Sequence, residues 1–250
     1  MRARMLLPAL VDLIYPPRCI GCGAEAGAAH ALCPACWRDT VFTAPPGCRH
    51  CGAPVLDAPG RGGDIACEDC TRIPPGWDRG ASAMLYGGGG RALVLALKHG
   101  DRLDLVPPLA RWMIRAAGPI LQPPALIVPV PLHWTRLARR RYNQAAELAR
   151  AIARATGLPC APRLLRRVRA TGSQDGKSAE QRAANLVGAF AARPVPAGLR
   201  VVLIDDVMTT GATLSACAAA LRAAGADRVD VLVAARVTRT DALAHGAADA

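Results

Sequence analysis

Val201-Val-Leu-Ile-Asp-Asp-Val-Met-Thr-Thr-Gly-Ala-Thr-Leu214 is the stretch that decides the fold. Its four apolar residues, 201–204, predict a strand that is buried on both faces, as a parallel sheet requires. Asp205 and Asp206 follow at the carboxyl end, where ligands of open α/β sheets bind, and adjacent carboxylates can accept hydrogen bonds from neighbouring sugar hydroxyls. The small residues of the next loop can wrap a phosphate at the start of a helix: Thr209, Thr210, Gly211, Ala212 and Thr213. The stretch therefore predicts a sugar-phosphate site.

The residues after this loop have the spacing of a helix. Leu214, Cys217 and Leu221 recur at helical intervals, and Gly225 follows as a C-terminal cap. The alternative for the whole stretch is an ordinary strand, loop and helix with two solvated acids. So many positions of the stretch fit a sugar-phosphate site at once that this alternative is disfavoured.

Composition indicates a soluble globular chain. Its 250 residues are 52% hydrophobic and 20% charged, which is enough to bury a sizeable core in one or two domains. No segment reaches the length of a transmembrane span. Residues 1–13 combine basic and apolar side chains, but Asp12 interrupts them and residues 15–18 are no small-residue cleavage site, so we expect a short docking helix and not a signal peptide.

Eight of the ten cysteines fall into four Cys-x-x-Cys pairs. Each pair places two thiolates on one tight turn, and two pairs complete a tetrahedral shell of four sulfurs for Zn2+. Gly23 and Gly52 directly follow the second cysteine of their pairs, where such a turn commonly needs a residue that tolerates positive φ. We predict two structural zinc ions, with sequential pairing as the simplest scheme: Cys19, Cys22, Cys33 and Cys36 in one site, and Cys48, Cys51, Cys67 and Cys70 in the other.

Two alternatives to this scheme stay open at the level of sequence. In the first, an interleaved cross-brace, the cysteine pairs would be exchanged between the two sites. In the second, a redox or disulfide cluster, the cysteines would hold no metal. Cytosolic chains use such pairs more often to bind metal than to form disulfides. His30 and His50 lie nearby, but eight thiols suffice for two ions, so both histidines are interpreted as bystanders. Cys217 lies on the apolar stripe of its helix and is predicted to be a small core residue.

Charge is distributed unevenly along the chain. Residues 1–80 carry eight basic and eight acidic side chains, so the net charge of +12 comes entirely from residues 81–250. Residues 133–200 alone hold 14 Lys or Arg against three acids. This basic segment can serve a polyanionic substrate, a nucleic acid or simply solvated helix faces.

One stretch of the basic segment has the residue types of a diphosphate site. An apolar strand near residues 126–130 ends in prolines, and clustered arginines up to Arg141 follow it. Asn143 is the predicted N-cap of the next helix and Gly157 its end. Guanidinium groups pair bidentately with phosphate oxygens, so Arg141 is a candidate ligand for a pyrophosphate.

The other stretch is residues 169–185. Its Gly, Ser and Thr content predicts a mobile loop that would act as a lid over a bound phosphate, with Lys177 and Arg182 as its candidate contacts. For both stretches a solvated basic face is the alternative.

In chain order, these motifs resemble one family closely: the ComF, or ComFC-like, competence family. The loop resembles the motif by which type I phosphoribosyltransferases bind phosphoribosyl pyrophosphate (PRPP). In that family two acids hold the ribose hydroxyls and the loop holds the 5′-phosphate, roles that the resemblance assigns to Asp205, Asp206 and residues 209–213. The other matching segments are 15–19, the four cysteine pairs, 97–101, 128–133, 141–144, 171–174, 182–185 and 188–190.

The resemblance implies a type I phosphoribosyltransferase-like α/β fold, in which a mostly parallel sheet is flanked by helices, behind an N-terminal double zinc-ribbon module. The expected strands are 82–86, 125–130, 201–205 and 228–234. The expected divisions are residues 1–70 for the zinc ribbons with a short N-terminal helix, 71–80 for a linker, 81–237 for the phosphoribosyltransferase-like domain and 238–250 for a flexible tail.

Function follows less directly than fold, because one fold hosts many functions. The resemblance implies a cytoplasmic factor of DNA uptake and natural transformation that binds PRPP, contacts single-stranded DNA and works with a competence helicase or DNA-processing proteins. The alternative is a free-standing phosphoribosyltransferase of nucleotide or amine salvage, in which Mg2+ neutralises the leaving pyrophosphate. No general base is evident, so no catalytic residue is assigned. Aromatic residues make up only 4% of the chain, which favours electrostatic contact with DNA over base stacking.

Overall fold

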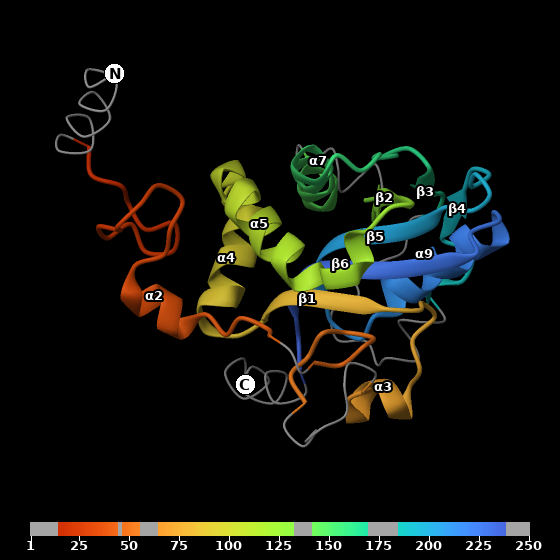
Figure 1. Cartoon of the computed structure of the whole chain (residues 1–250), viewed down its shortest axis with the longest axis horizontal. Helices are drawn as coiled ribbons and strands as arrows, with labels where there is room; N and C mark the ends of the chain where they lie inside the picture. Colours follow the sequence, from red (N-terminus) through yellow and green to blue (C-terminus); the bar gives the residue numbers. More distant parts are fainter. Residues whose placement is uncertain (1–14, 45–46, 56–64, 133–141, 170–184, 239–250) are drawn as a thin grey trace.

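The computed structural model describes residues 15–44, 47–55, 65–132, 142–169 and 185–238 (Figure 1). It confirms the expected fold class. Four parallel strands form one sheet in the order β1-β6-β5-β2, and helices pack on both of its faces. The helix expected within residues 1–13 lies outside the described residues, as does the tail beyond Thr238.

All four expected strands are present in this sheet. They are β1 (Gly80–Leu85), β2 (Ala125–Pro129), β5 (Arg200–Met208) and β6 (Arg228–Arg236). β5 and β6 occupy the centre and are almost continuously buried, as their runs of Val, Leu, Ile and Ala predict. β5 continues beyond Ile204 because Asp205 and Val207 still pair with β6, so the two acids lie within the strand and not after its end.

Alternate side chains of the strands face opposite layers, as the period of two in a strand requires. Val202 and Ile204 belong to the core on one face, and Val201 and Leu203 belong to the core on the other. The first face is covered by α4 (Gly88–His99), α5 (Val106–Ala117) and α7 (Gln144–Thr156), with the short 3-10 turns η1 (Leu103–Leu105) and η2 (Gly118–Leu121) flanking α5. The second face carries α9 (Ala212–Ala223) and a two-stranded ribbon of β3 (Leu165–Arg167) and β4 (Phe190–Ala192).

The predicted helix ends are confirmed. Asn143 caps α7, its side chain accepting a hydrogen bond from the N–H of Ala145, and Gly157 ends the helix in the left-handed region with φ +74°. Gly225 follows α9 with φ +98°, which a side chain at that position would disfavour. Cys217 is fully buried in α9 against the sheet, as a core residue.

The described part of the N-terminal region, residues 15–44, 47–55 and 65–79, contains two short helices. α2 (Pro34–Asp39) begins directly after Cys33, and α3 (Glu68–Arg72) begins directly after Cys67. No helix within the described ranges combines the length and apolarity that crossing a membrane requires.

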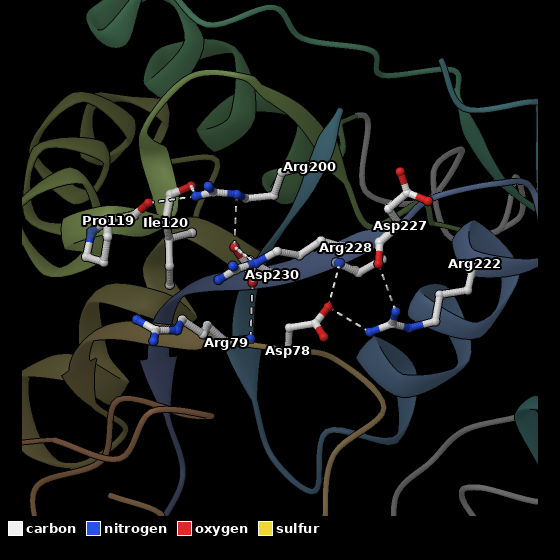
Figure 2. Close-up of polar contacts among 10 residues, drawn as sticks. Asp78, Arg79, Pro119, Ile120, Arg200, Arg222, Asp227, Arg228 and Asp230 are labelled. Atoms are coloured by element: carbon white, nitrogen blue, oxygen red, sulfur yellow. Dashed lines mark hydrogen bonds and ion pairs between the residues drawn. The ribbon is translucent and has the colours of Figure 1, made fainter. Parts of the chain in front are cut away.

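A buried carboxylate lies near the amino end of β6 (Figure 2). Asp230 is fully buried, and its Oδ1 accepts hydrogen bonds from the backbone N–H of Arg79 and from Nε of Arg228, each at 3.1 Å. Nε of Arg200 lies 3.6 Å from Oδ2. Burial raises the pKa of Asp230, while the two arginines oppose that shift.

Asp78 makes a second attachment beside it. Its Oδ2 accepts hydrogen bonds from the backbone N–H of Val229 (2.8 Å) and from Nη2 of Arg222 (2.7 Å) (Figure 2). The segment between α3 and β1, which the sequence suggested as a linker, is therefore attached at residues 78–79 to the amino end of β6 and to the last turn of α9.

Candidate functional site

The structure brings the eight paired cysteines together as two tetrads. In each, the sulfur atoms lie within 4.8 Å of one another. The grouping is sequential and not interleaved: Cys19, Cys22, Cys33 and Cys36 form the first tetrad, and Cys48, Cys51, Cys67 and Cys70 form the second. The Sγ atoms of Cys22 and Cys33 are 3.7 Å apart, as are those of Cys51 and Cys67. Two thiolates bound to one tetrahedral Zn2+ at about 2.3 Å are about 3.8 Å apart, so both tetrads fit structural zinc.

The turns of the first cysteine pair in each tetrad follow the expectation from sequence. Gly23 and Gly52 have φ of +78° and +72°. The histidines are not part of the tetrads: among the described residues neither belongs to a group that could hold a metal, and His50 Nε2 accepts a hydrogen bond from Nε of Arg49 at 2.9 Å.

Backbone groups favour the thiolate form of Cys19, one of the four cysteines of the first tetrad. The N–H of Cys33 donates to Cys19 Sγ at 3.2 Å. Burial raises the pKa of the Cys19 thiol, but backbone hydrogen bonds from Cys33, Cys22 and Gly21 outweigh it and lower the pKa to about 6. A thiolate is the form that binds zinc, so this arrangement supports metal binding near neutral pH.

The two tetrads have different surroundings. Cys48, Cys51 and Cys70 of the second tetrad belong to the same hydrophobic core as α9 and the second face of the sheet. The first tetrad touches the main core through Ile20, and its Cys22 is exposed.

The loop between β5 and α9 encloses a pocket of about 100 Å3. Small-molecule sites are typically about 300–1,000 Å3, so this pocket has the size of a phosphoryl group and not of a whole sugar phosphate. Gly211 is the N-cap of α9 and has φ +78°. The first turn of a helix leaves N–H groups without intrahelical acceptors, which makes it suited to an anion. The pocket is lined by Leu186, Asp205, Val207, Met208, Thr209, Thr210, Gly211, Ala212, Thr213 and Leu214.

The two acids of β5 have different neighbours. Asp205 lines the pocket, whereas Asp206 is not among its lining residues and its Oδ2 lies 3.4 Å from Nζ of Lys98 in α4. Desolvation and the charge of Asp206 raise the pKa of Asp205 to about 8, against the opposing charge of Lys98. Adjacent positions of a strand face opposite sides, which explains why only one of the acids faces the loop.

The candidate pyrophosphate contacts Arg141, Lys177 and Arg182 lie outside the described residues. The residues that follow Arg141 are described: Tyr142 donates a hydrogen bond from its hydroxyl to the carbonyl oxygen of Leu97 (2.6 Å), and Asn143 donates one from Nδ2 to that of Val130 (3.0 Å). The start of α7 is thereby held beside the carboxyl end of β2.

Sequence reasoning gave no role to three residues that surround the site. Lys98 lies in one of the matching segments, Trp77 lies in the expected linker, and Arg236 lies two residues beyond the strand expected at 228–234. Their partners are distant in sequence, and no local motif marks such contacts.

Comparison with known proteins identifies the family. A family described as "Double zinc ribbon domain" matches residues 10–71, and one described as "Phosphoribosyl transferase domain" matches residues 143–244. "Competence protein F" of Haemophilus influenzae is 31% identical over 223 residues, which are 86% of this chain and 94% of that protein. The chain belongs to the ComF-like family.

Other relatives of this ComF-like protein carry a second name. "DNA utilization protein YhgH" of Salmonella typhimurium is 34% identical over 227 residues, which cover 88% of the chain and 96% of the relative. The protein of the same name from Escherichia coli K12 is 31% identical over 227 residues, with the same coverage. The likeness therefore extends over both the zinc-ribbon region and the sheet.

Proposed function

We propose that this ComF-like protein binds PRPP together with Mg2+ and acts in DNA uptake and natural transformation, where it contacts single-stranded DNA. The observation that carries the proposal is the pocket between β5 and α9, in which an acid, three threonines and a left-handed glycine meet at a helix N-terminus. The names of the relatives, "Competence protein F" and "DNA utilization protein YhgH", support the DNA context. Ten free cysteines suit a reducing compartment, so we place the protein in the cytoplasm.

The residues of the site divide the ligand between them. Thr209, Thr210 and the first N–H groups of α9 donate hydrogen bonds to the 5′-phosphate, and Asp205 and Asp206 accept them from the ribose hydroxyls. Nζ of Lys98 lies 3.4 Å from Oδ2 of Asp206 and adds a positive charge on the side of α4. Bound Mg2+ would neutralise part of the pyrophosphate charge.

Calorimetric titration with PRPP tests this site. We expect binding that depends on Mg2+ and a loss of at least tenfold in affinity for the double variant Asp205→Asn, Asp206→Asn, since each lost hydrogen bond to a charged or polar partner is worth about 1 kcal/mol. Asp227→Asn changes an exposed acid at the amino end of β6 and serves as the control. Equal binding by the wild type and the double variant would remove the proposed site.

Release of pyrophosphate distinguishes a transferase from a binding protein. The wild-type chain is mixed with PRPP, Mg2+ and a panel of nucleobases and amines. Turnover with one of these acceptors would favour the salvage transferase, whereas PRPP binding without turnover would favour a ligand-binding pocket that serves DNA handling.

An aromatic cluster gives the DNA proposal a specific surface. The rings of Trp37 and Phe42 have centroids 4.5 Å apart, the rings of Phe42 and Trp112 have centroids 5.0 Å apart, and the guanidinium of Arg115 lies 5.9 Å from the Phe42 centroid. Trp37 is 46% exposed. Exposed aromatic rings beside arginines are the platforms on which single-stranded bases stack. The fold therefore gathers the scarce aromatic residues that the sequence leaves dispersed.

Salt dependence separates stacking from phosphate contacts. For a single strand the slope of log K against log salt is about −0.7 per neutralised phosphate. We expect the double variant Arg163→Glu, Arg166→Glu, at two exposed positions, to flatten the slope, and Trp37→Leu to weaken binding of an oligothymidylate with the slope unchanged. If the wild type shows no affinity for single strands at low salt, the DNA part of the proposal fails.

A further inference from the structure

The phosphate loop lies against a tryptophan from the zinc-ribbon side of the molecule. Trp77 is 5% exposed, and its ring is so close to Gly211 that a Cβ atom on that glycine would lie 2.6 Å from Cη2 of the ring. At the indole nitrogen, Trp77 Nε1 donates a hydrogen bond to the carbonyl oxygen of His50 at 2.7 Å. His50 lies between Cys48 and Cys51, so one buried side chain bridges the second tetrad and the loop.

Arg236, the last residue of β6, makes a second bridge. It is 7% exposed, and its Nη1 donates hydrogen bonds to the carbonyl oxygens of Met208 (3.3 Å), Thr209 and Val237 (2.6 Å). Its Nη2 lies 3.9 Å from Oδ2 of Asp69 in α3, the helix of the second tetrad. A buried guanidinium thus fixes the carbonyl groups where the loop begins and pairs with an acid of the zinc ribbon.

The turn of the second tetrad is also packed directly on the sheet. A Cβ atom on Gly52 would lie 2.5 Å from the backbone nitrogen of Ser82, and one on Gly80 would lie 2.0 Å from the carbonyl oxygen of His50. The N–H of Gly76 donates a hydrogen bond to Oγ of Ser215 in the first turn of α9 at 3.3 Å. These contacts leave no space in which the ribbon could shift without moving its neighbours.

We propose that the second zinc ribbon positions the phosphate loop through Trp77 and Arg236, so that zinc binding at the second tetrad and PRPP binding at the loop are coupled. The inference rests on the proposed function, because PRPP is the ligand whose affinity reports the state of the loop. Loss of this zinc frees the turn that holds Trp77 and the helix that carries Asp69. The apparent affinity for PRPP then falls in proportion to the fraction of molecules whose loop stays competent.

Variants of the two positioning residues test the coupling by calorimetry with PRPP and Mg2+ on the zinc-loaded full chain. We expect Trp77→Leu to bind PRPP about tenfold more weakly, as when a tenth of the molecules keep a competent loop. Arg236→Lys keeps the positive charge but cannot reach all three carbonyl groups, and we expect it to weaken binding as well. Tyr15→Leu, which removes an aromatic side chain that is 78% exposed, is the control and should bind as the wild type does. Metal analysis and thermal melting verify that each variant is folded with two zinc ions.

The outcomes separate this inference from the proposed function. If the wild type does not bind PRPP, the proposed function fails. If the wild type binds PRPP, and Trp77→Leu and Arg236→Lys both bind it as tightly as the wild type does, the coupling is refuted and the proposed PRPP site is retained.

The effect of PRPP on zinc affinity provides a second measurement. It would not change if Trp77 and Arg236 had a purely structural role. A coupling free energy acts equally in both directions, so PRPP must raise the affinity for one of the two zinc ions by the factor by which that zinc raises the affinity for PRPP. Equilibrium competition against a chromophoric chelator, with and without PRPP, measures this factor. We expect one zinc ion to shift and the other to stay, and the shift to disappear in Trp77→Leu. Equal behaviour of the two ions would refute the coupling.

Discussion

The two zinc ribbons have the same ligands and the same sulfur spacing, yet they differ in what surrounds them. The first tetrad lies at the edge of the molecule, with an exposed Cys22, and meets the main core through Ile20. The second tetrad contributes three of its four cysteines to the core beneath α9. Identical metal chemistry therefore serves two purposes: the first ribbon is a peripheral module, and the second is part of the domain that holds the phosphate loop.

Removing ligands from each tetrad in turn should give the largest contrast. We expect Cys67→Ser, Cys70→Ser to lower the unfolding midpoint of the sheet by about 10 °C or more, since removing buried partners costs several kcal/mol and each kcal/mol shifts a domain of this size by about 2–4 °C. The double variant Cys33→Ser, Cys36→Ser should lose one zinc ion, and the unfolding midpoint of its sheet should fall by less than about 2 °C. Calorimetric melting together with metal analysis measures both, and equal shifts would abolish the distinction.

The attachment at Asp230 should come next in size. Asp230→Ala leaves Arg200 and Arg228 without their buried partner, and breaking a buried ion pair from one side costs about 3–5 kcal/mol. Because Asp230 also holds the segment between the second ribbon and β1, the second zinc ion should be lost more readily than the first. Urea denaturation and chelator competition test this, with the exposed Asp227→Ala expected to stay within about 0.5 kcal/mol of the wild type.

A rise in pH should lower the stability of the sheet and raise the stability of the zinc ribbons. The pKa of Asp205 is raised to about 8 in the folded chain and is about 3.9 in the unfolded chain. The folded state therefore binds the proton of Asp205 more tightly than the unfolded state does. The stability that this provides is fully present below about pH 4 and is lost as the pH rises through 8. Zinc binding releases thiol protons, so the ribbons gain stability as the pH rises.

The variant Asp205→Asn isolates the contribution of the sheet. The difference in unfolding free energy between wild type and variant should change by at most about 1.4 kcal/mol per pH unit between pH 5 and 8, measured by urea denaturation in excess zinc. A difference that does not vary with pH would show that Asp205 titrates normally.

The smallest effect is expected at the docking of the first ribbon. Arg102 donates a hydrogen bond from Nη2 to the carbonyl oxygen of Ile20 at 3.3 Å and pairs with Asp104, and its side chain is 41% exposed. Exposed ion pairs contribute about 0–1 kcal/mol, so Arg102→Ala should leave the melting of the sheet unchanged. Faster hydrogen exchange confined to residues 19–36 is the expected signature. An effect as large as that of Asp230→Ala would mean that the first ribbon is also integral to the domain.

The sequence predicted those features whose signals are local. Four cysteine pairs, an apolar strand with its small-residue loop, and the caps Asn143 and Gly157 each lie within a few residues, so spacing and residue type suffice. The continuation of β5 beyond the expected strand 201–205, through Asp206 to Met208, was not predicted, because pairing with β6 and not local propensity extends the strand. β3 and β4 are three residues long, too short for a periodic pattern.

The contacts that join the second ribbon to the loop lay beyond sequence reasoning for a different reason. Trp77 reaches Gly211, and Arg236 reaches Asp69, across more than half of the chain. Pro and Gly around residue 77 indicated a linker, and only the packed structure shows that its tryptophan is buried. Such pairs depend on the closure of the sheet, which no local pattern reports.

The position of β1 has a consequence for the order in which the protein forms during synthesis. β1 stands at one end of the strand order and pairs with β6, the last strand along the described residues. The first ribbon, within residues 19–36, needs no later segment to gather its thiolates and can take up zinc early. The second ribbon rests on β1 and shares its core with α9 and β6, so its surroundings are complete only when residue 236 has left the ribosome. We therefore expect the second site to reach its final stability later in synthesis than the first.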